Sequence, residues 1–227
     1  MMTTREYVKT FGVVIKQNDV GDADRSLTLL TEECGKIHIW VNGARRTRSR
    51  HLASSQLFCA SNFVLYKGTN IYRINTSEIV EPFFNLRMDL DKLNFGFYLT
   101  ELTNDGVQEG YDEKNKEILR LLLNSLHFIS NTNKNPELVV HIFEIRFLSL
   151  IGFAPLLHED SAEVGYGLIP LSQSAVKAVS HIVMSPLEKL FNFDVSDEVF
   201  AELRDFCGKY VGSQMGKEYI TTPTGIW

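Results

Sequence analysis

The feature that most constrains the fold of this chain is a change in hydrophobic period near residue 82. Before it, short runs alternate between apolar and polar residues, as in Lys36–Val41, which is the period of a half-buried β-strand. From Leu86 onward, apolar residues recur every three to five positions, which is the period of an amphipathic helix. The sequence therefore predicts an α+β protein with a β domain at residues 1–82 and an all-helical domain at residues 83–227.

The predicted β domain consists of short runs rich in β-branched and aromatic residues. Strands are expected at residues 7–16, 25–30, 36–41, 57–66, 71–74 and 76–80, with a polar turn over residues 17–24. About five strands over so short a stretch favour a small closed barrel of the oligonucleotide-binding (OB) type, with a compact sandwich as the alternative. Periodicity alone does not choose between the two.

The C-terminal domain is predicted to contain at least five helices. Three apolar stripes run over residues 86–102, 118–129 and 138–151, and further helices are expected at 172–184 and 196–215. Asn135 and Pro136 suit the cap and first position of the third helix, and Gly152 suits its end. Residues 154–170 lack a helical period and are predicted to form a loop, and residues 221–227 a tail.

Charge is divided unevenly along the chain. The net charge is −5, but residues 1–82 carry 11 Lys and Arg against 8 Asp and Glu, whereas the remainder carries 12 against 20. The β domain is therefore the part expected to meet phosphates. No apolar run is long enough to span a bilayer and the N-terminus lacks the apolar core of a signal peptide, so we expect a cytoplasmic protein without membrane contact.

The strongest local signal is the arginine loop, residues 45–50, which contains Arg45, Arg46, Arg48 and Arg50. Four guanidiniums in six residues create a local positive potential that attracts anions. The loop follows the strand in which Lys36, His38 and Trp40 share the face opposite Ile37, Ile39 and Val41. A tryptophan beside cations suits base stacking above a phosphate-tracking groove, whereas a covered Trp40 and a merely solvated loop are the alternatives.

Motifs for covalent chemistry are absent from the sequence. There is no Walker loop, no nucleophile elbow and no His-Glu-x-x-His pair. The three cysteines, Cys34, Cys59 and Cys207, lack metal-ligand spacing and are expected to be reduced thiols. We therefore expect no catalytic residue, no metal and no cofactor. A nuclease that uses Asp19, Asp22 and Asp24 with a divalent cation is a distant alternative.

Several segments together resemble the RecO family of bacterial DNA repair proteins. They are Gly12–Lys16, Gly21–Thr31, Gly35–Ile37 and Gly43–Arg46, followed less specifically by Leu65–Gly68, Leu86–Leu90, Glu144–Phe147 and Leu150–Pro155. The order and spacing of the first four are specific, and the resemblance covers most of the chain.

The resemblance implies an OB barrel followed by a helical domain, and a recombination mediator rather than an enzyme. It implies binding of single- and double-stranded DNA, annealing of complementary strands, and work with RecR to load RecA onto DNA coated by single-strand-binding protein, whose acidic, apolar tail would dock on the helical domain. It also implies association with the nucleoid during repair. Because Lys36, Arg45 and Arg46 match the family motif, the resemblance implies that they bind DNA. DNA contact by Trp40, Arg48 and Arg50 is predicted only from charge and proximity.

One departure from the family pattern concerns a zinc module. Many members carry four cysteines just after the segment equivalent to Gly152–Pro155, whereas residues 156–167 contain none, so the chain resembles a metal-free variant. Asp22, Asp24 and Arg25 also match the motif, and we expect them to shape the turn by pairing with one another. A protein-binding adaptor with little DNA affinity remains the competing function.

Overall fold

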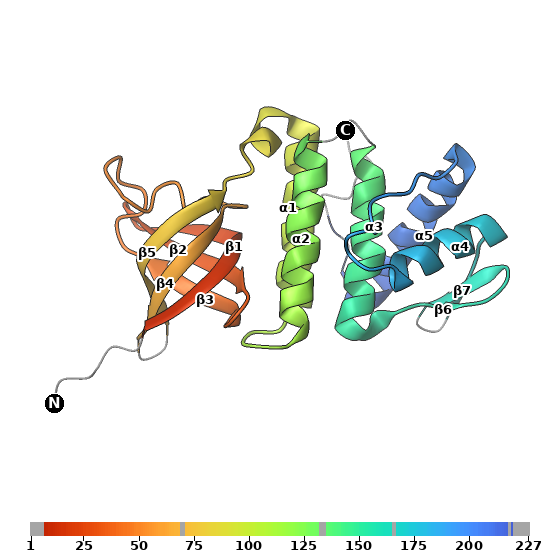
Figure 1. The fold of residues 1–227 in the computed structure, drawn as a ribbon, viewed down its shortest axis with the longest axis horizontal. Coiled ribbons are helices and arrows are strands. Elements are labelled where there is room, and N and C mark those ends of the chain that lie inside the picture. Colours follow the sequence, from red (N-terminus) through yellow and green to blue (C-terminus); the bar gives the residue numbers. More distant parts are fainter. Residues whose placement is uncertain (1–6, 69–70, 132–134, 165–166, 218, 220–227) are drawn as a thin grey trace. The chain divides into compact units, whose positions relative to one another are not determined.

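The computed structural model describes residues 7–68, 71–131, 135–164, 167–217 and 219 (Figure 1). The predicted tail at residues 221–227 lies outside the described residues. The chain forms two compact units, and we describe each by itself. The barrel unit comprises Met1–Met88 and Thr100–Leu119, and the helical unit comprises Asp89–Leu99 and Arg120–Trp227. The boundary proposed after residue 82 stays a prediction.

The barrel unit is built on five strands that close on themselves (Figure 1). They are β1 (Tyr7–Val20), β2 (Asp24–Thr31), β3 (Gly35–Val41), β4 (Ala60–Lys67) and β5 (Tyr72–Glu81). The order around the barrel is β1-β2-β3-β5-β4, and β4 pairs with β1 to complete it. The predicted OB-type barrel is confirmed, and the sandwich alternative is wrong.

Three strand predictions in this unit are wrong in their extent. The strand predicted at residues 57–66 begins only at Ala60, because residues 57 and 58 form a turn. The other two predictions concern β1 and β5. β1 continues through Gln17–Val20, which was predicted to be part of a turn, because these residues pair with β2 from Leu27 to Asp24. The two short strands predicted after residue 70 form the single strand β5. In both places backbone pairing with a neighbouring strand outweighs the low β-propensity of the polar side chains.

The barrel core comes from the inward face of the strands. Ile37, Ile39 and Val41 are buried, as the alternation predicts, and they pack against a cluster that includes Leu29 and Phe63. Burying a side chain of this size contributes about 1.5–3 kcal/mol relative to leaving it exposed. The same alternation turns Lys36, His38 and Trp40 outward, where none of the three is fully buried.

The predicted helices are present. They are α1 (Leu90–Gly106), α2 (Lys114–Asn131), α3 (Pro136–Leu148), α4 (Gln173–Met184) and α5 (Asp197–Met215), with a 3₁₀ turn η1 (Phe84–Met88) before α1. Asn135 caps α3 through Glu137 N and Pro136 is its first residue, and Ser196 caps α5 through Val199 N. These caps confirm the predicted starts of α3 and α5. Among the described residues no helix is long and apolar enough to cross a membrane.

The prediction that residues 154–170 form a loop is wrong. After a π-helical turn (η2, Ser149–Phe153), in which Gly152 has φ 103°, the chain forms a small antiparallel sheet. Its strands are β6 (Leu156–Leu157), β7 (Ser161–Val164) and β8 (Gly167–Pro170). Strands of two to four residues are too short to show a period in the sequence, and this sheet is held by its own pairing and by burial of Ala162 and Val164.

Candidate nucleic-acid interface

A carboxylate at the start of β2 organises the end of β3. Asp24 accepts a hydrogen bond from Trp40 Nε1 at 3.1 Å and another from the backbone N–H of Gly43 at 2.7 Å. These two donors, with Gly43 first, hold the pKa of Asp24 below its usual value. Gly43 has φ 64°, a conformation that glycine adopts without strain. Asp24 therefore fixes both the indole and the start of the arginine loop.

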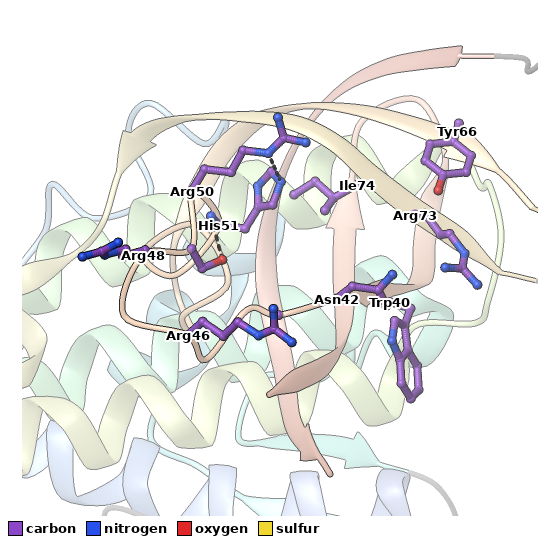
Figure 2. A pocket seen from close by; sticks show the side chains of 11 residues that line it. Trp40, Asn42, Arg46, Arg48, Arg50, His51, Tyr66, Arg73 and Ile74 are labelled. Carbon is purple, nitrogen blue, oxygen red and sulfur yellow. Dashed lines mark hydrogen bonds between the residues drawn. The ribbon is translucent and has the colours of Figure 1, made fainter. Parts of the chain in front are cut away.

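The arginine loop is a series of tight turns rather than an extended arm. Arg46 N donates to Gly43 O at 3.1 Å and Ser49 N to Arg46 O at 2.8 Å. Such turns project successive side chains in different directions. Figure 2 shows the Arg46 side chain extending toward Trp40, while that of Arg48 points the other way.

A pocket of about 500 Å³ opens between this loop and the end of the barrel. Figure 2 shows Trp40, Arg73 and Tyr66 along one side and the loop arginines along the other. Its described lining residues are Trp40, Asn42, Gly43, Arg46, Arg48, Ser49, Arg50, His51, Tyr66, Arg73 and Ile74. We call this the arginine pocket.

The arginine pocket is strongly cationic. Its lining includes four guanidiniums, all exposed, and no carboxylate among the lining residues that the structure describes. A second pocket of similar size on β1, β4 and β5 is lined by Glu33 and Glu78 against the single cation Lys9. Polyanions are therefore attracted to the first pocket and not to the second.

His51 anchors the loop beneath the pocket as a neutral imidazole. Burial, and then the neighbouring Arg50, lower the pKa of His51. Its Nε2 accepts from Arg50 Nε at 3.0 Å, and its Nδ1 lies 3.1 Å from Ser77 Oγ on β5. Because Nε2 is an acceptor, the proton is on Nδ1 and points to Ser77. The Arg50 guanidinium is thus held at the pocket by an imidazole, and no ion pair with a carboxylate is found for it among the described residues.

The structure brings four of the six predicted site residues together. Trp40, Arg46, Arg48 and Arg50 all line the arginine pocket. Arg45 lies outside the lining, because its Nε pairs with Asp19 at 3.2 Å and its Nη1 donates to Gly21 O at 3.1 Å.

Lys36 is the sixth predicted residue and lies at the other end of β3, four positions from Trp40, or roughly 13 Å along the strand. Its Nζ donates to Asn104 O at 2.8 Å, and burial lowers the pKa of its ammonium. The same stretch of β3 is bridged by backbone hydrogen bonds between Lys36 and Gly110. Lys36 therefore has a structural partner within the barrel unit.

Of the pocket residues that the sequence analysis missed, Arg73 and Tyr66 come from strands distant in sequence from the arginine loop. The short parallel pairing of β3 with β5 places Arg73 directly beside Trp40, and β4 pairs Tyr66 with Arg73. Arg73 could have been predicted from the barrel topology. In a closed OB-type barrel β5 lies beside β3, so a residue of β5 is expected next to Trp40.

The acidic turn does not form a metal site. The two Asp19 oxygens accept from Arg25 at 2.9 Å and Arg45 at 3.2 Å, and Asp24 is held by Trp40 and Gly43. Arg25 thus pairs with Asp19, and the expected pairing of Arg25 with Asp22 or Asp24 is wrong. Asp22 is exposed on the turn. The carboxylates of this turn are engaged by guanidinium and N–H donors, which is unlike a cation site.

Only one group of three His, Cys, Asp or Glu ligand atoms gathers within 4.8 Å among the described residues: His141, Glu144 and Cys207, all buried in the helical unit. His141 Nδ1 lies 2.7 Å from Glu144 Oε2, and Tyr98 Oη donates to Glu144. This contact between imidazole and carboxylate is a hydrogen bond. We interpret the group as a buried polar network.

Comparison with known proteins gives a consistent result. The model described as "Recombination protein O N terminal" matches residues 2–83, and "Recombination protein O C terminal" matches residues 87–163. The "DNA repair protein RecO" of Acetivibrio thermocellus is 34% identical over 237 residues, covering 94% of each chain. That of Clostridium acetobutylicum is 25% identical over 92% of this chain and 93% of its own, and that of Alkaliphilus metalliredigens is 36% identical over 66% of this chain and 60% of its own.

Proposed function

Because the chain belongs to the RecO family of DNA repair and recombination proteins, we propose that it is a recombination mediator. In this proposal it binds single- and double-stranded DNA, anneals complementary strands, and helps RecR load RecA onto DNA coated by single-strand-binding protein. The observation that carries the proposal is the arginine pocket, whose described lining contains four guanidiniums and an indole but no carboxylate, with Asp24 bound to Trp40 and Gly43 at its edge.

The proposed mechanism is to hold a strand and hand it over. Arg46, Arg48, Arg50 and Arg73 neutralise phosphates of the bound strand, which requires no particular base sequence. Trp40 offers a ring on which a base stacks, worth about 1–3 kcal/mol per base. A strand held by its backbone keeps its base edges free for pairing with a complement. No bond to the DNA is made or broken, so no catalytic residue is assigned.

The protein partners in this proposal follow from the family resemblance. RecR and the C-terminal tail of single-strand-binding protein are the expected partners, with the tail on the helical unit. Mixing purified components and measuring RecA loading onto coated single strands tests this part. Loading that does not depend on this chain would contradict it.

Titration of fluorescein-labelled single-stranded DNA at several salt concentrations tests the DNA-binding part. The logarithm of the association constant should fall linearly with the logarithm of salt, by about 0.7 per phosphate neutralised. Arg46→Glu with Arg73→Glu should weaken binding across sequences and flatten this slope. Arg45→Glu with Arg46→Glu tests the positions inherited from the family motif. Binding by these variants that equals wild type at every salt concentration would remove the loop from the mechanism.

The alternative is a protein-binding adaptor whose basic loop meets an acidic partner surface. It predicts weak DNA binding with a shallow salt slope even in the wild-type chain. The same titration therefore separates the two functions without any variant.

A further inference from the structure

The small sheet of the helical unit has an unusual outer face. The register aligns Leu156 on β6 with Glu163 on β7 and with Leu168 on β8. Residues opposite one another in register share a face, so two leucines flank one carboxylate across the three strands. Leu156 is 63% and Leu168 65% exposed. The solvent face of a one-sided antiparallel sheet normally carries polar side chains.

These leucines are not needed for the core of the sheet. The opposite face carries Leu157, Ala162 and Ile169 in the same register, and Ala162 is fully buried. The sheet is fixed to α5 at both ends: Phe153 O, just before β6, accepts from Tyr210 Oη at 2.7 Å, and Ser172 N, just after β8, donates to Glu202 Oε2 at 2.6 Å. The outer leucines are therefore held in place with their apolar surface exposed to water, where a partner's apolar side chains could cover them.

The electrostatics of this face restrict what can bind it. Residues 147–176 contain Glu159, Asp160 and Glu163 but no Lys or Arg. Glu163 lies 3.7 Å from His158 Nε2, an imidazole that carries charge only when protonated. Nucleic acid and acidic peptides are repelled by such a face. A partner with apolar and cationic side chains gains both burial and charge complementarity.

We propose that the outer face of β6–β8 is a docking surface for a basic amphipathic helix of a protein partner. The two leucines are separated by two interstrand spacings, or about 10 Å. Apolar side chains at positions i and i+7 of a helix are also about 10.5 Å apart. A helix laid across the strands thus places two apolar side chains on the leucines and an intervening Lys or Arg over Glu163. This surface is independent of the arginine pocket and of the acidic tail considered above.

Fluorescence anisotropy with the full-length chain tests the proposal. The probe is a labelled 18-residue helical peptide of Leu and Lys with one apolar stripe, and the matched control peptide replaces each Lys by Glu. Wild type should bind the Leu/Lys peptide saturably. Leu156→Ser with Leu168→Ser should weaken binding about tenfold or more, and Glu163→Lys should also weaken it. Met184→Ser is the matched control, because Met184 is 78% exposed elsewhere in the unit, and it should leave affinity unchanged.

Three results would overturn the proposal. Equal peptide affinity in the leucine variant and wild type would mean that the face is not used. Equal binding of the Leu/Glu peptide would remove the charge argument. Self-association of wild type that the leucine variant loses would identify the occupant as a second copy of this chain. Single-stranded DNA titration of the same variants should match wild type, so failure here is distinguishable from failure of the DNA-binding proposal.

Discussion

Trp40 donates its indole N–H to Asp24, with 3.1 Å between Nε1 and Oδ2. The carboxylate lies on β2 and the indole on the adjacent β3, so the contact locks the ring against its own barrel. An acidic group beside a proposed DNA site opposes polyanion binding by its charge but supports it by positioning Trp40. Removal of the Asp24 charge should therefore strengthen DNA binding if its repulsion of phosphates dominates, and weaken DNA binding if its positioning of Trp40 dominates.

Asp24→Asn is expected to weaken single-stranded DNA binding severalfold, although it removes a negative charge. The amide has one acceptor oxygen for the two donors that Asp24 accommodates, Trp40 Nε1 and Gly43 N. Anisotropy titration measures the affinity, and the emission of Trp40 in a Trp227→Phe background reports on the indole. Tighter DNA binding by Asp24→Asn would show that charge outweighs positioning.

The same contact should persist to unusually low pH. The Gly43 and Trp40 donors lower the pKa of Asp24 in the folded chain. A group with a depressed folded pKa contributes stability above its unfolded pKa, and that contribution is lost as pH falls through the folded value. Trp40 emission should therefore stay constant as pH falls through the ordinary aspartate range, about 3.9, and change only below it. A transition at the ordinary value would contradict the assigned hydrogen bonds.

Arg73→Gln is expected to weaken DNA binding more than Arg45→Gln does. Arg73 is exposed at the pocket, whereas Arg45 is paired with Asp19 outside it. Loss of one phosphate contact should reduce the salt slope by about 0.7–0.9. Parallel titrations of the two variants give their salt slopes. A larger reduction of the slope in Arg45→Gln than in Arg73→Gln would place the DNA path along the acidic turn instead.

Gly35→Ala is expected to destabilise the barrel unit more than Gly21→Ala. Both glycines have positive φ, 68° and 57°, so both substitutions incur the same conformational cost of about 1 kcal/mol. An added Cβ at Gly35 would lie 1.8 Å from Gly110 O, whereas at Gly21 it would meet nothing within 4 Å. Urea denaturation of the two variants isolates the cost of the clash, and equal midpoints would show that the residue 110 segment moves aside.

The His141–Glu144 pair predicts the response of the helical unit to mutation. Burial disfavours the imidazolium, but the carboxylates of Glu137 and Glu144 outweigh burial and raise the pKa of His141 well above its ordinary value. Breaking a buried pair by removing one partner costs about 3–5 kcal/mol. Glu144→Gln should therefore lower the urea midpoint strongly, whereas the double change His141→Leu, Glu144→Met should cost less, because it leaves no buried charge without a partner.

The stability due to this pair should also depend on pH. A raised folded pKa means that the contribution is complete below the unfolded value, about 6.5, and is lost as pH rises through the folded value. The difference in unfolding free energy between wild type and His141→Gln should narrow in alkaline solution. A difference that widens with pH would mean that His141 is buried as a neutral imidazole.

Much of the fold could be predicted from local pattern. The alternation of Ile37, Ile39 and Val41 predicted the inward face of β3, and Asn135 with Pro136 predicted the start of α3. The arginine loop and Trp40 were recognisable because they are adjacent in sequence. The sheet β6–β8 was missed, since its strands are too short to show a period and their register depends on pairing between them.

The sequence by itself determined the family, the barrel-then-helix order and most of the cationic loop, because each depends on residues close together in the chain. Only the tertiary structure decided which cations face one pocket. Closure of the barrel brings Arg73 and Tyr66 beside Trp40, while Asp19 draws Arg45 away and Asn104 O engages Lys36. Whether a cation is available to a ligand depends on partners distant in sequence, since the strength of an ion pair or hydrogen bond is set by proximity in space.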